Sequence, residues 1–419
     1  MNVTFMIESF IQTDVCIIGA GPAGAAASLT LSQNHIPHIL VDSAVFPRHK
    51  PCGDIITSGV LRALDLLDPE ILRSLKSRDL VNPVWTTHVY PPNGNPITID
   101  FLEFDRKEGE PSCYSLSRFD MDQVILEQVQ KSEYATVYQG CRITDIDHQP
   151  DAIILTSDQG FQIMAGLVIV ATGSNNNILK QIGLSVPRKD SAIGIRAHFE
   201  NIDFEKSETS LFLDSGIMPG GLYITPLPGN CFNVNLVVSL NKVSVENLNL
   251  REEFDKVIES NPILKQRFQN GRRLGNFEGS MLFLGVRKRV IAGNRFLVVG
   301  DSAGLIEFFS GNGIPQALLS GRMAAQKAKQ AIQHSDFSKE FLSRFEGEIY
   351  HKIKQNYAMG RVVYPLLHTR FFGKWVLKFL NYLSGRRQTN RLVRDLLYQK
   401  DPSKLALSPR FLYQLLIQR

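Results

Sequence analysis

The sequence predicts an α/β fold in which a domain built on a parallel sheet is joined to a mostly antiparallel sheet and a helical C-terminal region. Three observations predict this fold. An apolar strand runs into a Gly-rich turn and a helix at residues 15–31, and another apolar strand reaches a second Gly-rich turn at 296–304. Between residues 187 and 282, β-like runs alternate with clusters of turn residues, as in antiparallel sheets.

Composition and length fit a globular protein of two or three structural units. The chain has 419 residues, of which 43% are hydrophobic and 21% are charged. Its five cysteines are odd in number and scattered, which argues against a disulfide framework or a metal site and for a reducing compartment. Residues 1–14 lack the basic region of a secretory signal, and no run of about 18 uncharged apolar residues exists. We therefore expect a cytoplasmic protein without a metal or a membrane-spanning helix.

The first element has the order of a nucleotide-binding unit. The buried strand 15–18 is followed by a Gly-rich turn, a helix, and a second strand, 39–41, that ends at Asp42. Glycines let the backbone approach a pyrophosphate, a helix N-terminus attracts it, and the acid can accept hydrogen bonds from ribose. A Gly-rich turn can also serve only to pack a helix on a strand, but the full order of elements favours dinucleotide binding. The predicted contacts are Gly19, Ala20, Gly21, Pro22, Ala23, Gly24 and Asp42.

The second Gly-rich segment indicates which dinucleotide is bound. Strand 296–299 leads to Asp301, and a glycine cluster precedes the helical stretch 316–333. An Asp in this place can bind a ribityl hydroxyl, and the helix N-terminus can stabilise charge at the N1–C2=O locus of a reduced flavin. NAD-binding folds do not need such a segment. The sequence therefore predicts a Rossmann-type FAD-binding domain that holds FAD non-covalently, with contacts from Asp301, Gly311, Asn312, Gly313 and Ile314.

These segments resemble a known family. Asp301–Gly304, followed by Gly311–Ile314, resembles the second FAD motif of the para-hydroxybenzoate hydroxylase fold. Within that fold the chain is similar to the geranylgeranyl reductase family, because residues 46–54 resemble its Pro-Cys-Gly segment and Ser117–Asp120 resembles a phosphate-binding segment. The resemblance implies further FAD contacts from Arg48, Lys50, Pro51, Gly53 and Arg118, and from Gly173 near the adenosine end.

Three side chains in the Pro-Cys-Gly segment each have a structural and a functional interpretation. Cys52 can be a small residue packed in a turn, or a residue beside the flavin that donates or relays a proton. Its position favours proximity to the flavin. Arg48 and Lys50 can be solvated surface cations, but their place just after Asp42 favours phosphate contact.

The substrate-binding part is expected in the antiparallel region. Geranylgeranyl reductases carry the pattern P-x-x-Y-x-W-x-F-P, and aligning its last proline with Pro226 puts Gly221, Tyr223 and Thr225 at the three aromatic positions. The resemblance implies substrate contacts from Tyr223, Thr225 and Pro226. The predicted domains are an FAD-binding domain from 10–83, 111–186 and 283–335, a substrate domain from 84–110 and 187–282, and a helical basic region at 336–419.

The C-terminal region carries the positive charge of the chain. Arg361–Arg419 holds twelve basic and two acidic residues, a balance of +10, so the rest of the chain carries −5. Basic and apolar residues such as Lys374, Trp375, Lys378, Phe411 and the pair Arg386 and Arg387 interleave in this region, at helical spacing over 371–380. The region either covers the FAD domain with its charged side solvated, or contacts an anionic membrane or an acidic partner. No nucleic-acid-binding motif is present, so no nucleic acid partner is expected.

The sequence therefore predicts an FAD-dependent oxidoreductase that reduces a C=C bond of a hydrophobic, prenyl- or lipid-like, or carrier-bound substrate. A single dinucleotide fingerprint implies that NAD(P)H binds transiently or that an external donor supplies electrons. A flavin-dependent monooxygenase of the same fold is the first alternative. An electron-carrier flavoprotein is the alternative from another class.

Overall fold

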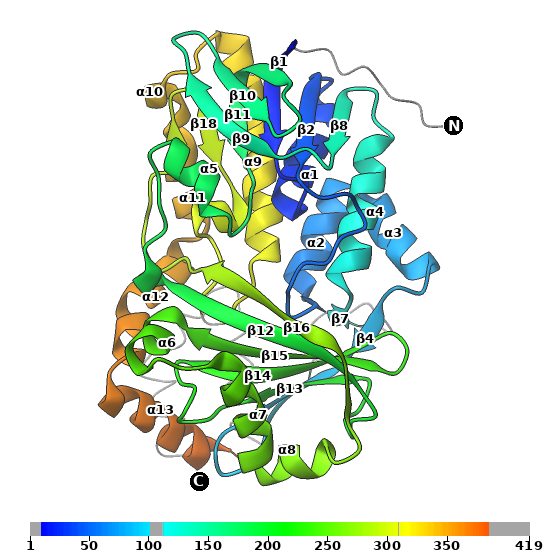
Figure 1. The fold of residues 1–419 in the computed structure, drawn as a ribbon, viewed down its shortest axis with the longest axis vertical. Helices are drawn as coiled ribbons and strands as arrows, with labels where there is room; N and C mark the ends of the chain where they lie inside the picture. The colour runs from blue at the N-terminus through cyan, green and yellow to red at the C-terminus, as the bar shows by residue number, and fades with distance from the viewer. Residues whose placement is uncertain (1–9, 101–110, 112, 309, 385–419) are drawn as a thin grey trace.

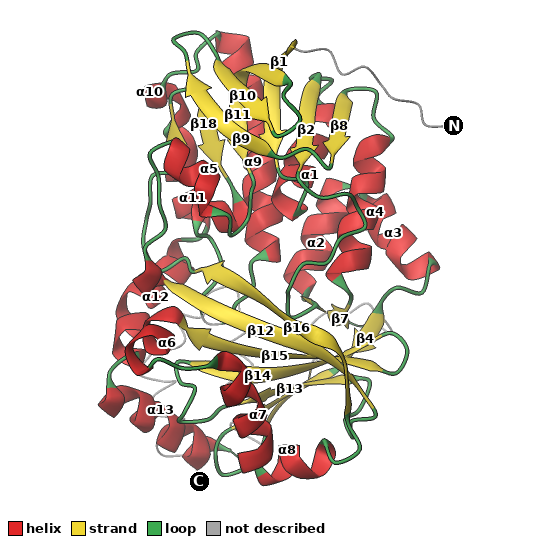
Figure 2. Cartoon of the chain, viewed as in Figure 1, coloured by secondary structure: helices red, strands yellow, loops and turns green. Residues whose placement is uncertain are grey.

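The computed structural model describes residues 10–100, 111, 113–308 and 310–384. It contains a parallel sheet with its helices at one end and a mostly antiparallel sheet at the other, with the C-terminal helices running along one side of both (Figure 1). The strands of the two sheets run in different directions (Figure 2). The predicted fold class is confirmed.

The first sheet has eight strands, and its main path follows the order β17-β18-β11-β1-β2-β8. Strands β18, β11, β1, β2 and β8 run parallel to one another, so their carboxyl ends share one edge, whereas β17 and β10 pair antiparallel with β18 and β11. Ile18 pairs with Val170, and Val170 pairs with Val298, which brings three distant parts of the sequence together. The strands are β1 (Phe10–Ile18), β2 (His38–Asp42), β8 (Ala135–Gln139), β9 (Ile143–His148), β10 (Ile153–Ser157), β11 (Gln162–Val170), β17 (Ala292–Gly293) and β18 (Phe296–Val298).

Helices α1 (Pro22–Gln33) and α9 (Ile314–His334) pack tightly against each other, and α1 also packs against β1 and β2 of this sheet. Their close approach depends on glycine, because a Cβ on Gly321 would lie 2.0 Å from the carbonyl oxygen of Ala23. Nearly every residue of α1 is buried, as expected for a helix between a sheet and other helices. The other helices of this part are α2 (Ser58–Leu67), α3 (Pro69–Ser77), α4 (Arg118–Gln130) and α5 (Asn176–Gln181).

The second sheet has seven strands in the order β16-β12-β15-β14-β13-β5-β6. All neighbours are antiparallel except β13 and β5, which are parallel. Strands β5 and β6, from the first segment of the predicted substrate domain, join this sheet from a distant part of the sequence. The strands are β5 (Thr86–Tyr90), β6 (Ile97–Asp100), β12 (Ser191–Glu200), β13 (Glu208–Phe212), β14 (Gly220–Leu227), β15 (Cys231–Ser239) and β16 (Arg272–Phe283).

The two faces of the second sheet differ in polarity. Alternate residues such as Ile195, Val234 and Leu222 form an apolar core with Phe254 and Leu264 of the helices α7 (Leu250–Ser260) and α8 (Pro262–Arg267). Residues that pair directly across strands share a face, and the registers therefore place polar side chains on the opposite side. We define this polar face by Arg196, Tyr223, Thr225, Asn233, Asn235 and Ser280.

Smaller elements connect the two sheets. A three-stranded sheet consists of β3 (Ile55–Ile56), β7 (Cys113–Ser115) and β4 (Asn82–Val84), and short helical segments are η1 (Arg188–Asp190), α6 (Leu240–Glu246) and η2 (Gly300–Ala303). The C-terminal helices are α10 (Lys339–Leu342), α11 (Arg344–Lys352), α12 (Lys354–Leu367) and α13 (Arg370–Leu383). Within the described ranges, no helix is long and apolar enough to cross a bilayer.

Candidate active site

The predicted nucleotide turn lies at the carboxyl edge of the parallel sheet. Gly19 has a φ of 104°, and a Cβ there would lie 2.4 Å from the carbonyl oxygen of Ala171. A Cβ on Gly24 would lie 1.7 Å from the carbonyl oxygen of Gly19. Gly21 is different, because the nearest atom to its Cβ position is Nη2 of Arg48 at 3.4 Å. Gly19 and Gly24 therefore allow the chain to pack, whereas Gly21 leaves space in front of the turn.

Helix α1 begins at this space. Its N-cap residue, Gly21, has no side chain that could cap the helix, so its first backbone N–H groups can bind an anion. Pro22 occupies the first helical position, where a missing N–H has no cost. The turn therefore has the open space and the donors that a pyrophosphate requires.

Asp42 ends strand β2 and lies beside the same turn. Its Oδ2 accepts a hydrogen bond from the backbone N–H of Ala20 at 2.7 Å, and its Oδ1 accepts one from Ala44 at 2.8 Å. These bonds fix the carboxylate, and each oxygen keeps a second lone pair with which it can accept from ribose.

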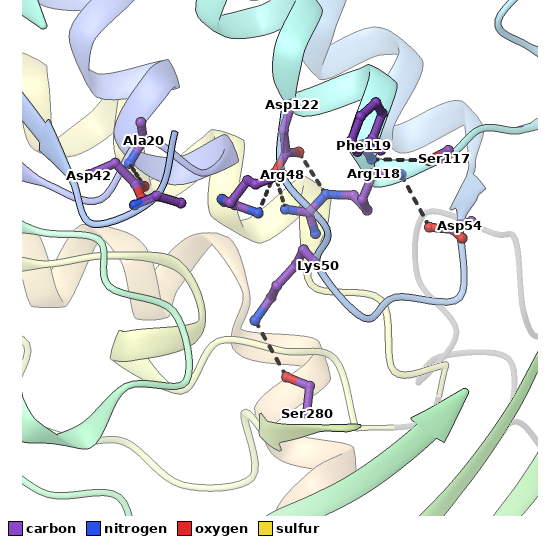
Figure 3. A network of polar contacts seen from close by, with 11 residues as sticks. Ala20, Asp42, Arg48, Lys50, Asp54, Ser117, Arg118, Phe119, Asp122 and Ser280 are labelled. Atoms are coloured by element: carbon purple, nitrogen blue, oxygen red, sulfur yellow. Dashed lines mark hydrogen bonds and ion pairs between the residues drawn. The ribbon is translucent and has the colours of Figure 1, made fainter. Parts of the chain in front are cut away.

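A buried group of charges lies next to the turn (Figure 3). Arg118, in the first turn of α4, donates from Nε and Nη2 to the two carboxylate oxygens of Asp122, both at 2.7 Å. Nη1 of Arg48 is 3.2 Å from Oδ2 of Asp122 but has no hydrogen-bond partner within the described part of the chain. Two guanidinium groups thus share one carboxylate, and the surplus positive charge lies where Arg48 approaches Gly21. This arrangement fits the phosphates of FAD.

Lys50 extends from the same loop toward the second sheet (Figure 3). Its Nζ lies 3.4 Å from Oγ of Ser280 and 3.8 Å from the Cβ position of Gly173, the glycine that follows β11. Burial lowers the pKa of Lys50, and the nearby carboxylate of Asp301 opposes that effect. Lys50 therefore lies between two parts of the molecule. On one side are the turns that follow β11 and β18, and on the other side is the polar face.

The second Gly-rich segment follows β18 and meets the first. Asp301 lies in η2, and a Cβ on Gly313 would be 3.0 Å from its Oδ1. Gly313 is the N-cap residue of α9 and, like Gly21, has no side chain that could cap its helix. Gly311 has a φ of 70°, which a glycine adopts without strain. An acid and an uncapped helix N-terminus therefore lie together, as a ribityl chain and a flavin pyrimidine would require.

Cys52 is half-buried, and its side chain packs against the core of the parallel-sheet part. Its backbone oxygen accepts a hydrogen bond of 2.7 Å from Nδ2 of Asn233 in β15. Burial raises the pKa of the Cys52 thiol, the charge of Asp54 adds to the effect, and Arg118 opposes it. The thiol therefore favours its protonated form, which suits a proton donor and does not suit a nucleophile.

Asp54 is a site residue that the sequence analysis did not single out. Its side chain has no solvent exposure, and its Oδ2 accepts from Arg196 Nη1 at 2.9 Å and from Asn233 Nδ2 at 2.8 Å. Burial raises the pKa of Asp54 to about 7, although the charges of Arg196 and Arg118 lower it. One signal was present in the sequence, because Arg196 is a cation within the run of small and apolar residues 192–197.

The proposed substrate residues are divided between the faces of the second sheet. Tyr223 and Thr225 lie on the polar face, where they pair with Asn235 and Asn233. Pro226 pairs with Phe232, which belongs to the apolar core on the other side. The structure thus places two of the three predicted side chains toward the loop that carries Cys52.

The fold and the site together define an FAD-dependent oxidoreductase. A family model described as an FAD binding domain matches residues 12–257, and the chain belongs to this family. The match spans the nucleotide turn and strands β12, β14 and β15 of the polar face, and it ends before Ser280 and the second Gly-rich segment. Both the predicted cofactor and the predicted enzyme class are confirmed.

Relatives with known names support the resemblance to geranylgeranyl reductases. The digeranylgeranylglycerophospholipid reductase of Thermoplasma volcanium is 25% identical over 342 residues, which is 80% of this chain and 82% of the relative. A 1H-pyrrole-2-carbonyl-[peptidyl-carrier protein] chlorinase of Pseudomonas fluorescens is 23% identical over 403 residues, 89% of each chain.

Solved structures confirm the fold. A geranylgeranyl bacteriochlorophyll reductase-like protein from Thermoplasma acidophilum has a TM-score of 0.74 and 21% identity, covering 97% of this chain and 96% of its own. The halogenase PltM in complex with phloroglucinol and FAD has a TM-score of 0.69 and 17% identity, covering 93% of this chain and 84% of its own.

Proposed function

We propose that the protein is a reductase that saturates a C=C bond of a hydrophobic, prenyl-lipid-like substrate. A carrier-bound substrate, reduced by the same chemistry, is the alternative. The observation that carries the proposal is the similarity to digeranylgeranylglycerophospholipid reductases over about four fifths of the chain. FAD, when bound and reduced, supplies the hydride. NAD(P)H or an external donor would reduce it, because the sequence contains one dinucleotide fingerprint.

The residues that would hold FAD lie at the carboxyl edge of the parallel sheet. The Gly19–Gly24 turn and Arg48, beside Arg118, would bind the pyrophosphate, and Asp42 would bind the adenosine ribose. Asp301 would bind the ribityl chain, and the N-terminus of α9, at Gly313 and Ile314, would face the flavin pyrimidine. The backbone at Pro51, Gly53, Gly173, Gly311 and Asn312 would line the remaining space.

The protein would contribute a proton and the orientation of the substrate. Cys52 lies in the loop that Asn233 tethers to the polar face, and it is the group proposed to donate or relay a proton. Tyr223 and Thr225 would line the substrate side of the pocket. Burial raises the pKa of Tyr223 to about 12, so its hydroxyl stays protonated and can donate a hydrogen bond.

Anaerobic reduction of the purified yellow protein tests the proposal. We expect an unsaturated prenyl lipid to reoxidise the flavin without oxygen, with the reduced lipid as product. Reoxidation that requires oxygen, with a flavin hydroperoxide absorbance, would instead support a monooxygenase of this fold, to which the halogenase neighbours point. Fast reoxidation by a quinone alone would support an electron carrier.

A surface stripe on α13 supports contact with a lipid bilayer. Phe371, Lys374, Trp375, Lys378 and Tyr382 follow helical spacing, and we call them the aromatic–basic stripe. Phe371 is 83% exposed and Trp375 is 50% exposed, while Leu377 and Leu383 on the other side of the helix are buried. Helix α13 has no acidic residue. We propose reversible docking on an anionic membrane, which would bring the pocket to a lipid substrate.

A further inference from the structure

Asn233 makes an unusual pair of contacts for a residue in the middle of a sheet. It is 1% exposed, and its single Nδ2 group donates both to the backbone oxygen of Cys52 at 2.7 Å and to Oδ2 of Asp54 at 2.8 Å. The amide thus uses its two N–H bonds to hold two residues of one loop. Its Oδ1 is buried and has no hydrogen-bond partner within the described residues.

Asp54 fixes the same loop from the other side. Its φ of 58° is in the left-handed region, where an Asp is tolerated better than most residues but still at a cost. Its carboxylate forms an ion pair with Arg196, and Arg196 forms a second ion pair with Glu278 at 2.9 Å. The backbone N–H of Arg118, at the start of α4, lies 3.4 Å from its Oδ1. The loop is therefore held between α4 and the polar face.

This network is costly if its only role is stability. Burying a carboxylate and a guanidinium costs several kcal/mol, and well-packed apolar side chains would often stabilise an interface equally well. What a buried, directional network provides is a fixed position. The backbone position that it fixes here is that of Cys52.

We infer that Asn233 and Asp54 are positioning residues for Cys52, and that they hold its thiol at the boundary between the flavin site and the substrate sheet. This inference rests on the proposed function only in that the Cys52 thiol is taken to donate or relay a proton. The placement itself is a property of the loop, so it can be measured without a substrate.

Alkylation of Cys52 by iodoacetamide in the FAD-loaded protein tests the placement. A Cys231→Ser background leaves Cys52 as the one cysteine that is not buried. Asn233→Ser removes both tethering bonds, and we expect Cys52 to be alkylated about tenfold faster, as mapped by mass spectrometry. Asn235→Ser is the matched control, because it lies two residues away on the same face but has no hydrogen bond to the loop among the described residues.

Equal rates of Cys52 alkylation in Asn233→Ser and the parent would overturn the inference. Equally faster alkylation in Asn233→Ser and Asn235→Ser would also overturn it, because it would indicate that the sheet as a whole has become less rigid. If Asn233→Ser does not retain flavin, Asn233→Thr, which suits a strand, replaces it with the same expectation.

The catalytic use of the position is tested in the same variants. Single-turnover reoxidation by an unsaturated prenyl lipid should slow about tenfold in Asn233→Ser while the substrate Kd stays unchanged. If Cys52 of a variant is alkylated faster but the variant turns over at the parental rate, the catalytic role of the thiol is overturned. A parent protein that no such lipid reoxidises contradicts the proposed function, and the alkylation result still decides the placement.

Discussion

The carboxyl edge of the parallel sheet and the polar face of the antiparallel sheet meet at the proposed flavin site, but they build it from different groups. The edge uses backbone, through the space at Gly21 and the uncapped N-termini of α1 and α9. The face uses side chains, through Asn233 and Arg196. Backbone sites depend on a few small residues at fixed spacing, whereas side-chain sites depend on strand register. Mutations at the edge of the parallel sheet and mutations on the polar face should therefore have different effects on the protein.

The largest effect is expected from two glycines of one turn. Gly24→Val would place a Cβ 1.7 Å from the carbonyl oxygen of Gly19, so the variant should not yield a folded protein. Gly21→Val meets no atom closer than a movable guanidinium at 3.4 Å and should fold, but its side chain would fill the pyrophosphate space. Circular dichroism and the ratio of flavin to protein separate these outcomes. A folded Gly21→Val with wild-type flavin content would contradict the assignment of the turn.

The next effect concerns the charges beside the edge. Asp122→Asn leaves Arg118 and Arg48 without their shared carboxylate, and we expect a loss of about 3 kcal/mol in the unfolding free energy of the apoprotein. FAD should reduce this loss, since its phosphates can neutralise the two guanidinium groups. Glu127→Gln on the same helix is the control, because it removes the charge of the exposed pair with Arg78 and should change the unfolding free energy much less. Denaturant titration of apo and FAD-loaded proteins gives both values.

A smaller effect is expected from the titration of Asp54. Burial raises its folded-state pKa to about 7, above the ordinary value of an unfolded Asp. The stability that this shift contributes is fully present below the unfolded pKa and is lost as pH rises to about 7. The melting temperature of the wild type relative to Asp54→Asn should therefore fall between pH 4 and pH 8. A difference that is constant or rises over this range would show that the raised pKa is wrong.

The same contrast explains how much could be predicted from the sequence. The nucleotide turn was predictable because Gly19, Gly21 and Gly24 stand at a fixed spacing between a strand and a helix, and this local pattern is visible in the sequence. The contacts of Asp54 with Arg196 and Asn233 were not, because they join residues 142 and 179 positions apart. Such contacts depend on the register of β12 and β15, which no local pattern specifies. Arg386, Arg387 and Phe411, named in the sequence analysis, lie outside the described residues.

The smallest effect is expected at the aromatic–basic stripe. The stripe belongs neither to the edge of the parallel sheet nor to the polar face, and we expect it to affect only the access of substrate to the pocket. Each basic residue near an anionic surface contributes on the order of 1 kcal/mol, screened by salt, and exposed aromatic rings add apolar burial. The double variant Phe371→Ser, Trp375→Ser should therefore bind anionic vesicles about tenfold more weakly without losing flavin. The double variant Leu66→Ser, Val245→Ser removes two comparably exposed apolar side chains from α2 and α6 and should bind like the wild type. Co-sedimentation at two salt concentrations measures both, and wild-type protein that stays in solution at low salt would contradict the membrane contact while leaving the flavin site as described.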